Sequence, residues 1–115
     1  MVEIFAGKFA VFRDVTTLMI DAAQVGRSEI IQSILNDNPD IDINAQNFKG
    51  ESALILAAKS GNIDALKILI NNGGTILEFG ISDNKGNTAL HHAAKQGNLD
   101  ILELLSLKFV SIYHT

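Results

Sequence analysis

The 115-residue sequence predicts an all-α solenoid, in which pairs of short antiparallel helices stack along one axis. The main observation is an internal repeat, because residues 49–64 recur as residues 85–100 at a constant offset of 36. A more divergent copy at residues 17–29 lies 35 residues before the matching part of the middle copy. The second observation is that glycines and helix-capping residues recur at matching places in the copies. Periods of this length are typical of units that cannot bury their apolar face alone.

The middle copy indicates how the first helix of each unit forms. Gly50 suits a tight turn with positive φ, and Ser52 is placed to cap the helix that follows. Leu54, Ala57 and Ala58 then fall at i, i+3 and i+4, on one apolar stripe. Because the alanines are small, a neighbouring helix can approach closely.

The second helix of the unit is expected to begin at once. Gly61 suits the C-terminal cap of the first helix, and Asn62 is placed to cap the second. Asp64 falls in the first turn of that helix, where a carboxylate stabilises the helix dipole. Glu29 and Asp100 occupy equivalent positions in the other copies. We therefore interpret these carboxylates as structural rather than catalytic.

These motifs resemble those of ankyrin repeats. Residues 86–98 read Gly-Asn-Thr-Ala-Leu-His-His-Ala-Ala-Lys-Gln-Gly-Asn and are similar to the core motif of that family, while the Asp-Ile-Asn-Ala of residues 42–45 is similar to its connector. The resemblance covers about residues 14–107 and implies three ankyrin repeats, the first degenerate, joined by β-hairpin-like loops. The spacings of 35 and 36 exceed the family period of roughly 33. This implies insertions near residues 38–40 and 74–76, with longer or bulged hairpins there.

The expected organisation has three parts. Residues 1–13 form an apolar segment and a candidate capping helix, and residues 14–107 form the repeat domain. The repeats span about 14–46, 47–82 and 83–107, and residues 108–115 form a C-terminal tail. Phe5, Phe9 and Phe12 in the first segment have helical spacing. The apolar ends have three explanations: coverage by this segment, a place within a longer array, or self-association as a homodimer.

Composition and charge disfavour several functions. The net charge of −4 and the pI of about 5.2 argue against binding to nucleic acid. No apolar run approaches the roughly 20 residues that a membrane-spanning helix needs. The chain has no cysteine and so no disulfide framework. We expect an intracellular, cytoplasmic protein, with the nucleus as the open alternative, and no cofactor.

The adjacent histidines His91 and His92 invite a metal-binding or catalytic interpretation. Neighbouring helical residues point in directions about 100° apart, so the pair cannot chelate one ion from one helix face. The resemblance implies that His91 bonds near the capping Thr88, whereas His92 is expected to make a surface contact. No phosphate-binding glycine loop or nucleophile motif is present in the sequence. We therefore expect neither a metal site nor enzymatic activity.

The sequence predicts a non-catalytic protein-binding module. It would present its hairpin tips and the concave face of its first helices to a protein partner of unknown identity. Lys49 and Lys85 share one repeat position, and Lys59 and Lys95 share another. They predict a basic stripe suited to a partner with an acidic patch, although lysines also serve simply as solubilising residues. The predicted partner-binding residues are Gln46, Phe48, Lys49, Glu51, Lys59, Ser60, Asn84, Lys85, Asn87, His92, Lys95 and Gln96.

Two questions stay open from the sequence. Phe48 is predicted at the tip of the first hairpin, where it either contacts a partner or packs against the adjacent hairpin. The alternative function is a structural or regulatory scaffold segment of a larger ankyrin array, or a chain that self-associates through its apolar ends.

Overall fold

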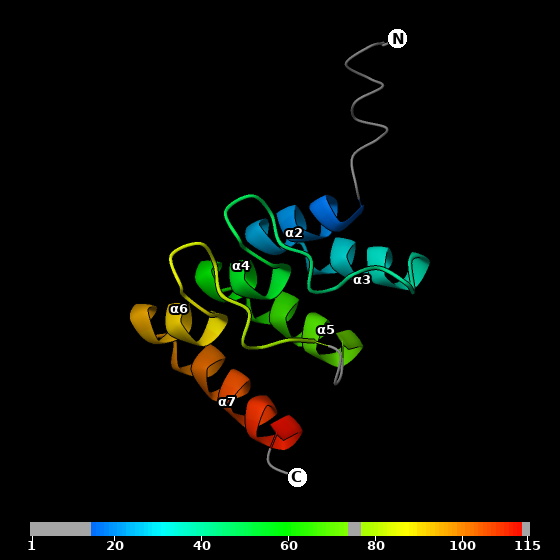
Figure 1. Ribbon diagram of the computed structural model, residues 1–115. Coiled ribbons are helices and arrows are strands. Elements are labelled where there is room, and N and C mark those ends of the chain that lie inside the picture. Colours follow the sequence, from blue (N-terminus) through cyan, green and yellow to red (C-terminus); the bar gives the residue numbers. More distant parts are fainter. Residues whose placement is uncertain (1–14, 74–76, 114–115) are drawn as a thin grey trace.

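Residues 15–73 and 77–113 are described in the computed structural model, with side chains described as far as residue 107. Within these residues the chain forms helix pairs that stack in sequence order (Figure 1). Helices α2, α4 and α6 pack on one another in one layer, and α3, α5 and α7 follow each other in a second layer. The helices are α2 (Val15–Val25), α3 (Ser28–Asp37), α4 (Ala53–Ser60), α5 (Ile63–Gly73), α6 (Ala89–Gln96) and α7 (Leu99–Tyr113).

The predicted all-α class is confirmed. The described part of the chain holds no sheet, only an isolated antiparallel bridge between Gln46 and Ser52. This bridge closes the first loop, residues 46–52, which leads into α4, and residues 82–88 form the second loop, which leads into α6. The Asn47 N–H donates to the Glu51 carbonyl at 2.9 Å, and the equivalent bond of the second loop has the same length. The tips of the two loops are therefore alike.

The core runs along the interface between the two layers. Met19 of α2, Leu54 of α4 and Leu66 of α5 are almost completely buried, as is Ile101 of α7. The first helices α2, α4 and α6 pack on one another, and small residues such as Ala57 are fully buried in them, which allows close packing. This close packing places the loops that precede α4 and α6 side by side on one flank of the stack (Figure 1).

Most of the predicted caps are confirmed. The Ser52 hydroxyl accepts from the Ile55 N–H at 3.2 Å, and Gly61 adopts a left-handed conformation with φ of 76° at the end of α4. The Asn98 side chain caps α7 by accepting from the Ile101 N–H at 3.2 Å. These bonds satisfy backbone groups that would otherwise lack partners at the helix ends.

The expectation that Asn62 caps α5 with its side chain is wrong. Its amide instead donates to the Ala23 carbonyl at 2.9 Å and to the Gln24 carbonyl at 3.3 Å. These carbonyls belong to the end of α2 in the preceding repeat. Asn62 therefore joins one repeat to the next, because stacking brings an unsatisfied helix end within reach of its amide.

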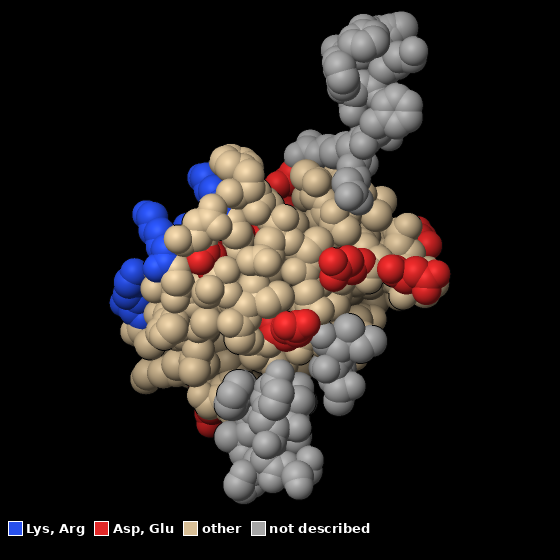
Figure 2. All heavy atoms as spheres, in the orientation of Figure 1, with Lys and Arg blue, Asp and Glu red and all other residues tan. Residues whose placement is uncertain are grey.

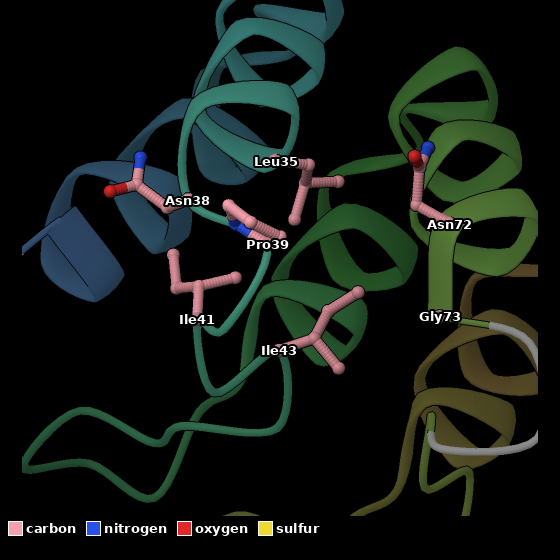
Figure 3. A pocket seen from close by; sticks show the side chains of 7 residues that line it. All are labelled: Leu35, Asn38, Pro39, Ile41, Ile43, Asn72 and Gly73. Atoms are coloured by element: carbon pink, nitrogen blue, oxygen red, sulfur yellow. The ribbon is translucent and has the colours of Figure 1, made fainter.

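The connector after α3 contains the first predicted insertion. Asn38 closes α3, since its amide donates to the Ile34 carbonyl at 2.8 Å. Leu35, Ile41 and Ile43 line a hollow of about 260 Å³ between this connector and the end of α5 (Figure 3). Asn38, Pro39, Asn72 and Gly73 complete its lining.

Several expectations lie outside the described residues, namely the capping segment at residues 1–13 with its phenylalanines and the second insertion at residues 74–76. At the other end, α7 extends to Tyr113, beyond the expected repeat boundary at residue 107. No glycine or proline follows Leu107 to stop the helix. Among the described helices, none is long and apolar enough to cross a membrane.

Candidate partner-binding groove

A groove of about 530 Å³ lies between the two loops and the helices α4 and α6. All but three of the predicted partner-binding residues line it, and the exceptions are Gln46, Phe48 and Ser60. The groove also includes Asp83, which is not among the residues predicted from the sequence. Its lining consists of Lys49, Glu51, Lys59, Asp83, Asn84, Lys85, Asn87, His92, Lys95 and Gln96.

Glu51 forms the base of the groove in the second repeat. It is only 6% exposed, so its predicted place on an open surface is wrong. Its carboxylate accepts from Lys59 at 3.0 Å and from the Asn47 amide at 3.1 Å. Burial raises the pKa of this carboxyl, but the hydrogen bonds from Lys59 and Asn47 outweigh it and the pKa is lowered. Glu51 therefore stays ionised, and its ion pair with Lys59 ties the first loop to α4.

Asp83 forms the base of the groove in the third repeat. One of its carboxylate oxygens accepts from the backbone N–H groups of Asn87 at 2.9 Å and Lys85 at 3.0 Å. The other lies 2.9 Å from Nε2 of His92. The backbone hydrogen bond from Asn87, followed by that from His92, lowers the pKa of Asp83 to about 2. The carboxylate is thus ionised at neutral pH, so it accepts a hydrogen bond from the Nε2–H group of His92.

The structure corrects the expectation for His92 as a surface contact. His92 is 7% exposed, because its ring fills the space between α6 and the second loop to reach Asp83. The same position in the second repeat is Leu56, which is also buried. The prediction for His91 is confirmed, since its Nδ1 accepts from the Thr88 N–H at 3.0 Å in a capping box.

Basic side chains dominate the rim of the groove. Lys49, Lys85 and Lys95 form no ion pair with any acidic side chain in the part of the chain that the structure describes. In Figure 2 the visible basic side chains gather on the flank formed by the loops and α6, while most visible acidic ones lie elsewhere. The basic stripe predicted from the lysine spacing is therefore present on an acidic protein of net charge −4.

The two loops are bonded to each other, which fixes the shape of the groove. Asn84 donates its backbone N–H to the Lys49 carbonyl at 3.0 Å and its amide to the Phe48 carbonyl at 2.9 Å. The Gln46 amide donates to the Ser82 carbonyl at 3.1 Å. Gln46 and Asn84 thus have a structural role, joining the two loops, that the sequence pattern did not reveal.

Phe48 lies at the tip of the first loop with 88% of its surface exposed. The alternative that it packs against the adjacent loop is therefore wrong. Its ring contacts the side chain of its neighbour, with Nζ of Lys49 6.0 Å from the ring centroid. An exposed aromatic residue beside a basic groove offers an apolar contact to a bound chain.

Two further predicted residues lie at the ends of the first helices. Ser60 is exposed at the end of α4, outside the groove. Gln96 occupies the equivalent position on α6, and its amide donates to the Lys59 carbonyl. This bond ties the third repeat to the second along the rim.

The described residues contain no cluster of three or more histidine, aspartate or glutamate side chains that would hold a metal ion. His91 and His92 have separate partners, Thr88 and Asp83. What the groove offers chemically is a set of ammonium and amide donors above two internally bonded carboxylates. Such a surface suits recognition of a negatively charged chain.

The stacked helix pairs, with loops projecting along one flank, define a helical-repeat protein of the solenoid class. The family model for ankyrin repeats matches residues 18–114 in three copies. The chain therefore belongs to the ankyrin-repeat family, and its resemblance to that family is confirmed. No match was found among the curated proteins.

Proposed function

We propose that this protein is a non-catalytic interaction module that binds a protein partner through its loop tips and the concave face formed by α4 and α6. Ankyrin repeats are generally protein–protein interaction modules and are typically non-catalytic. The observation that carries the proposal is the groove itself, which gathers most of the predicted residues from both loops and both helices.

The charge of the groove supports a partner with an acidic patch. The rim presents Lys49, Lys85 and Lys95, whereas the protein as a whole is acidic. Such a local field raises the rate of encounter with an acidic surface and disfavours basic ones. We further propose an intracellular, cytoplasmic or nuclear location, because the chain has no cysteine for disulfide formation.

The test is an affinity capture with the purified chain, read by mass spectrometry, in which a groove variant is compared with a control. The groove variant carries Phe48→Ala, Lys85→Ala and Lys95→Ala. Lys59 is left in place because its removal would leave the buried Glu51 without its ion-pair partner. The control carries exposed substitutions on the outer layer of helices, namely Ser33→Ala, Lys67→Ala and Asn71→Ala.

We expect the wild type and the control to capture a protein that the groove variant no longer captures. Both variants should keep the melting temperature of the wild type within a few degrees, since the replaced side chains are exposed. A captured protein whose yield is the same with all three chains would contradict the proposal.

A second candidate function is a scaffold segment, or a self-associating chain, whose contacts are made by the end of the stack. It is favoured by the apolar residues beside α6 and α7. Leu99 is 73% exposed, and Leu90 and Leu107 are also exposed. Leu90 borders an apolar hollow of about 130 Å³ that also contains Phe79 and Leu105.

Sedimentation velocity over a range of protein concentrations tests this candidate. Self-association through the end of the stack predicts a species that grows with concentration, and Leu99→Glu should return it to the monomer. A wild-type chain that sediments as a monomer throughout would rule out self-association through the end of the stack.

A further inference from the structure

We infer that the acidic partner binds in the groove as an extended glutamate- or aspartate-rich peptide segment, and that the third repeat provides the main carboxylate subsite, at Lys85 and Lys95. This inference rests on the proposed function, which it deepens by naming the kind of ligand and its place in the groove. It follows from a difference in charge pairing between two repeats that otherwise have the same construction.

The difference begins with two equivalent lysines. Lys59 and Lys95 stand at the same repeat position, one on α4 and the other on α6. The ammonium of Lys59 is held by Glu51 at 3.0 Å. The residue equivalent to Glu51 in the third repeat is Asn87, which carries no charge. Lys95 therefore lacks the internal carboxylate that neutralises Lys59.

Asp83 does not replace that carboxylate. It forms no ion pair with Lys85 or Lys95, although all three line the groove. Its oxygens accept from backbone N–H groups of its own loop and from His92, and its side chain is only 7% exposed. An incoming carboxylate thus meets two lysines whose charges are unpaired, while the acidic group beneath them is occupied by hydrogen bonds.

The second repeat adds contacts on the other side of the groove. Lys49 lies on the first loop and forms no ion pair within 4 Å among the described residues, although its charge acts on Glu51, and the exposed ring of Phe48 is next to it. An extended segment that crosses from α6 to the first loop therefore meets a carboxylate-binding subsite of two lysines, a weaker one of a single lysine, and an apolar contact in turn. This arrangement fits a peptide with acidic residues followed by an apolar residue.

A fluorescein-labelled peptide of alternating glutamate and serine is the probe, with binding measured by fluorescence anisotropy at low salt. Lys85→Gln and Lys95→Gln should each raise Kd by about twofold to fivefold, the range expected for exposed ion pairs. Lys67→Gln on α5 is the matched control and should leave Kd unchanged, because that exposed lysine does not line the groove.

The sharper test exchanges the charge pairing of the two repeats. Asn87→Glu places a carboxylate where Glu51 stands in the second repeat, so it should pair with Lys95 and raise Kd at least as much as Lys95→Gln. Glu51→Gln releases Lys59 and removes a negative charge from the groove, so it should lower Kd. The opposite directions separate an effect on the site from general destabilisation, and circular dichroism checks that each variant stays folded.

Several results would overturn the inference. They are equal Kd values for the wild type, Asn87→Glu and Glu51→Gln, no binding of the glutamate peptide, binding only when the peptide is phosphorylated, or tighter binding of a single-stranded oligonucleotide of equal charge. None of these results decides whether a protein partner uses the groove, because the capture experiment with the Phe48, Lys85 and Lys95 variant tests that separately.

Discussion

The second and third repeats build the same loop on the same short helix, yet they stabilise the base of that loop with different side chains. Asn47 and Asp83 each accept two backbone N–H groups of their own loop, at matching distances of 2.9 and 3.0 Å. Beneath the first loop Glu51 pairs with Lys59, whereas beneath the second Asp83 pairs with His92. The backbone is thus kept while the pairing of charges changes.

This comparison separates the residues that hold the fold from those that set the surface. Ser52 and Thr88 cap their helices alike, and Gly61 and Gly97 end them alike. The residues that differ between the copies decide instead which lysine is neutralised by an internal carboxylate and which is not. The charge pattern of the surface therefore changes between the repeats while the backbone stays the same.

The same two repeats also differ in how they are covered. Helix α4 lies between α2 and α6, while α6 packs against α4 and α7. The exposure of two equivalent leucines shows how much less α6 is covered, since Leu54 of α4 is 2% exposed and Leu90 of α6 is 39% exposed.

The largest effect is expected when these leucines are truncated. Leu54→Ala should lower the free energy of unfolding by about 2–5 kcal/mol, the range for a fully buried leucine. Leu90→Ala should cost about 1 kcal/mol, because the side chain is already in partial contact with water. Urea denaturation followed by circular dichroism measures both values. Equal losses would show that α4 and α6 are covered to the same extent.

A smaller difference is expected at the loop glycines. Gly50 and Gly86 have φ of 78° and 82°, so alanine at either position costs about 1–2 kcal/mol in backbone strain. At Gly50 a Cβ would also lie 2.5 Å from Oδ1 of Asn84 in the second loop, whereas at Gly86 it meets nothing within 4 Å. Gly50→Ala should therefore be the more destabilising change in thermal denaturation. If Gly86→Ala costs as much, the two loops are not packed together as described.

The smallest effect is expected from acid. The pKa of Asp83 is about 2 in the folded protein, below the ordinary value of 3.8, so the folded state binds this proton less readily than the unfolded chain. Its stabilising contribution is complete above about pH 4 and is lost as the pH falls toward 2. Asp83→Asn, which installs the residue found at position 47, should flatten the loss of stability over this range. An unchanged acid profile in unfolding experiments would contradict the described bonding of Asp83.

The helices and their caps could be predicted from the sequence because the residues that start and end a helix act locally. Ser52, Thr88 and Gly61 act on residues within one turn, so their roles follow from spacing alone. Asn62 could not be assigned in this way, because its partners lie in the preceding repeat. Its side chain has the same capping potential as that of Asn98, and stacking decides between them.

The candidate site was predictable in outline but not in its charge pairing. Repeat position placed the lysines on one face, and the structure brings them together in one groove. Burial of Glu51 and His92 depends on how each loop folds against its helix, which no local pattern reports. Asp83 was missing from the predicted site, although the sequence carries a signal for it. A carboxylate at the first position of the turn, followed by a histidine on the next helix, indicates a hydrogen bond between the two side chains.

Site-specific photo-crosslinking tests most directly whether the partner occupies the groove rather than the end of the stack. A benzophenone amino acid is placed at position 48 beside the groove in one chain and at position 99 at the end of the stack in another. Each chain is then irradiated with the captured partner. The groove assignment predicts a covalent adduct from position 48 and none from position 99. An adduct from position 99 alone would contradict it.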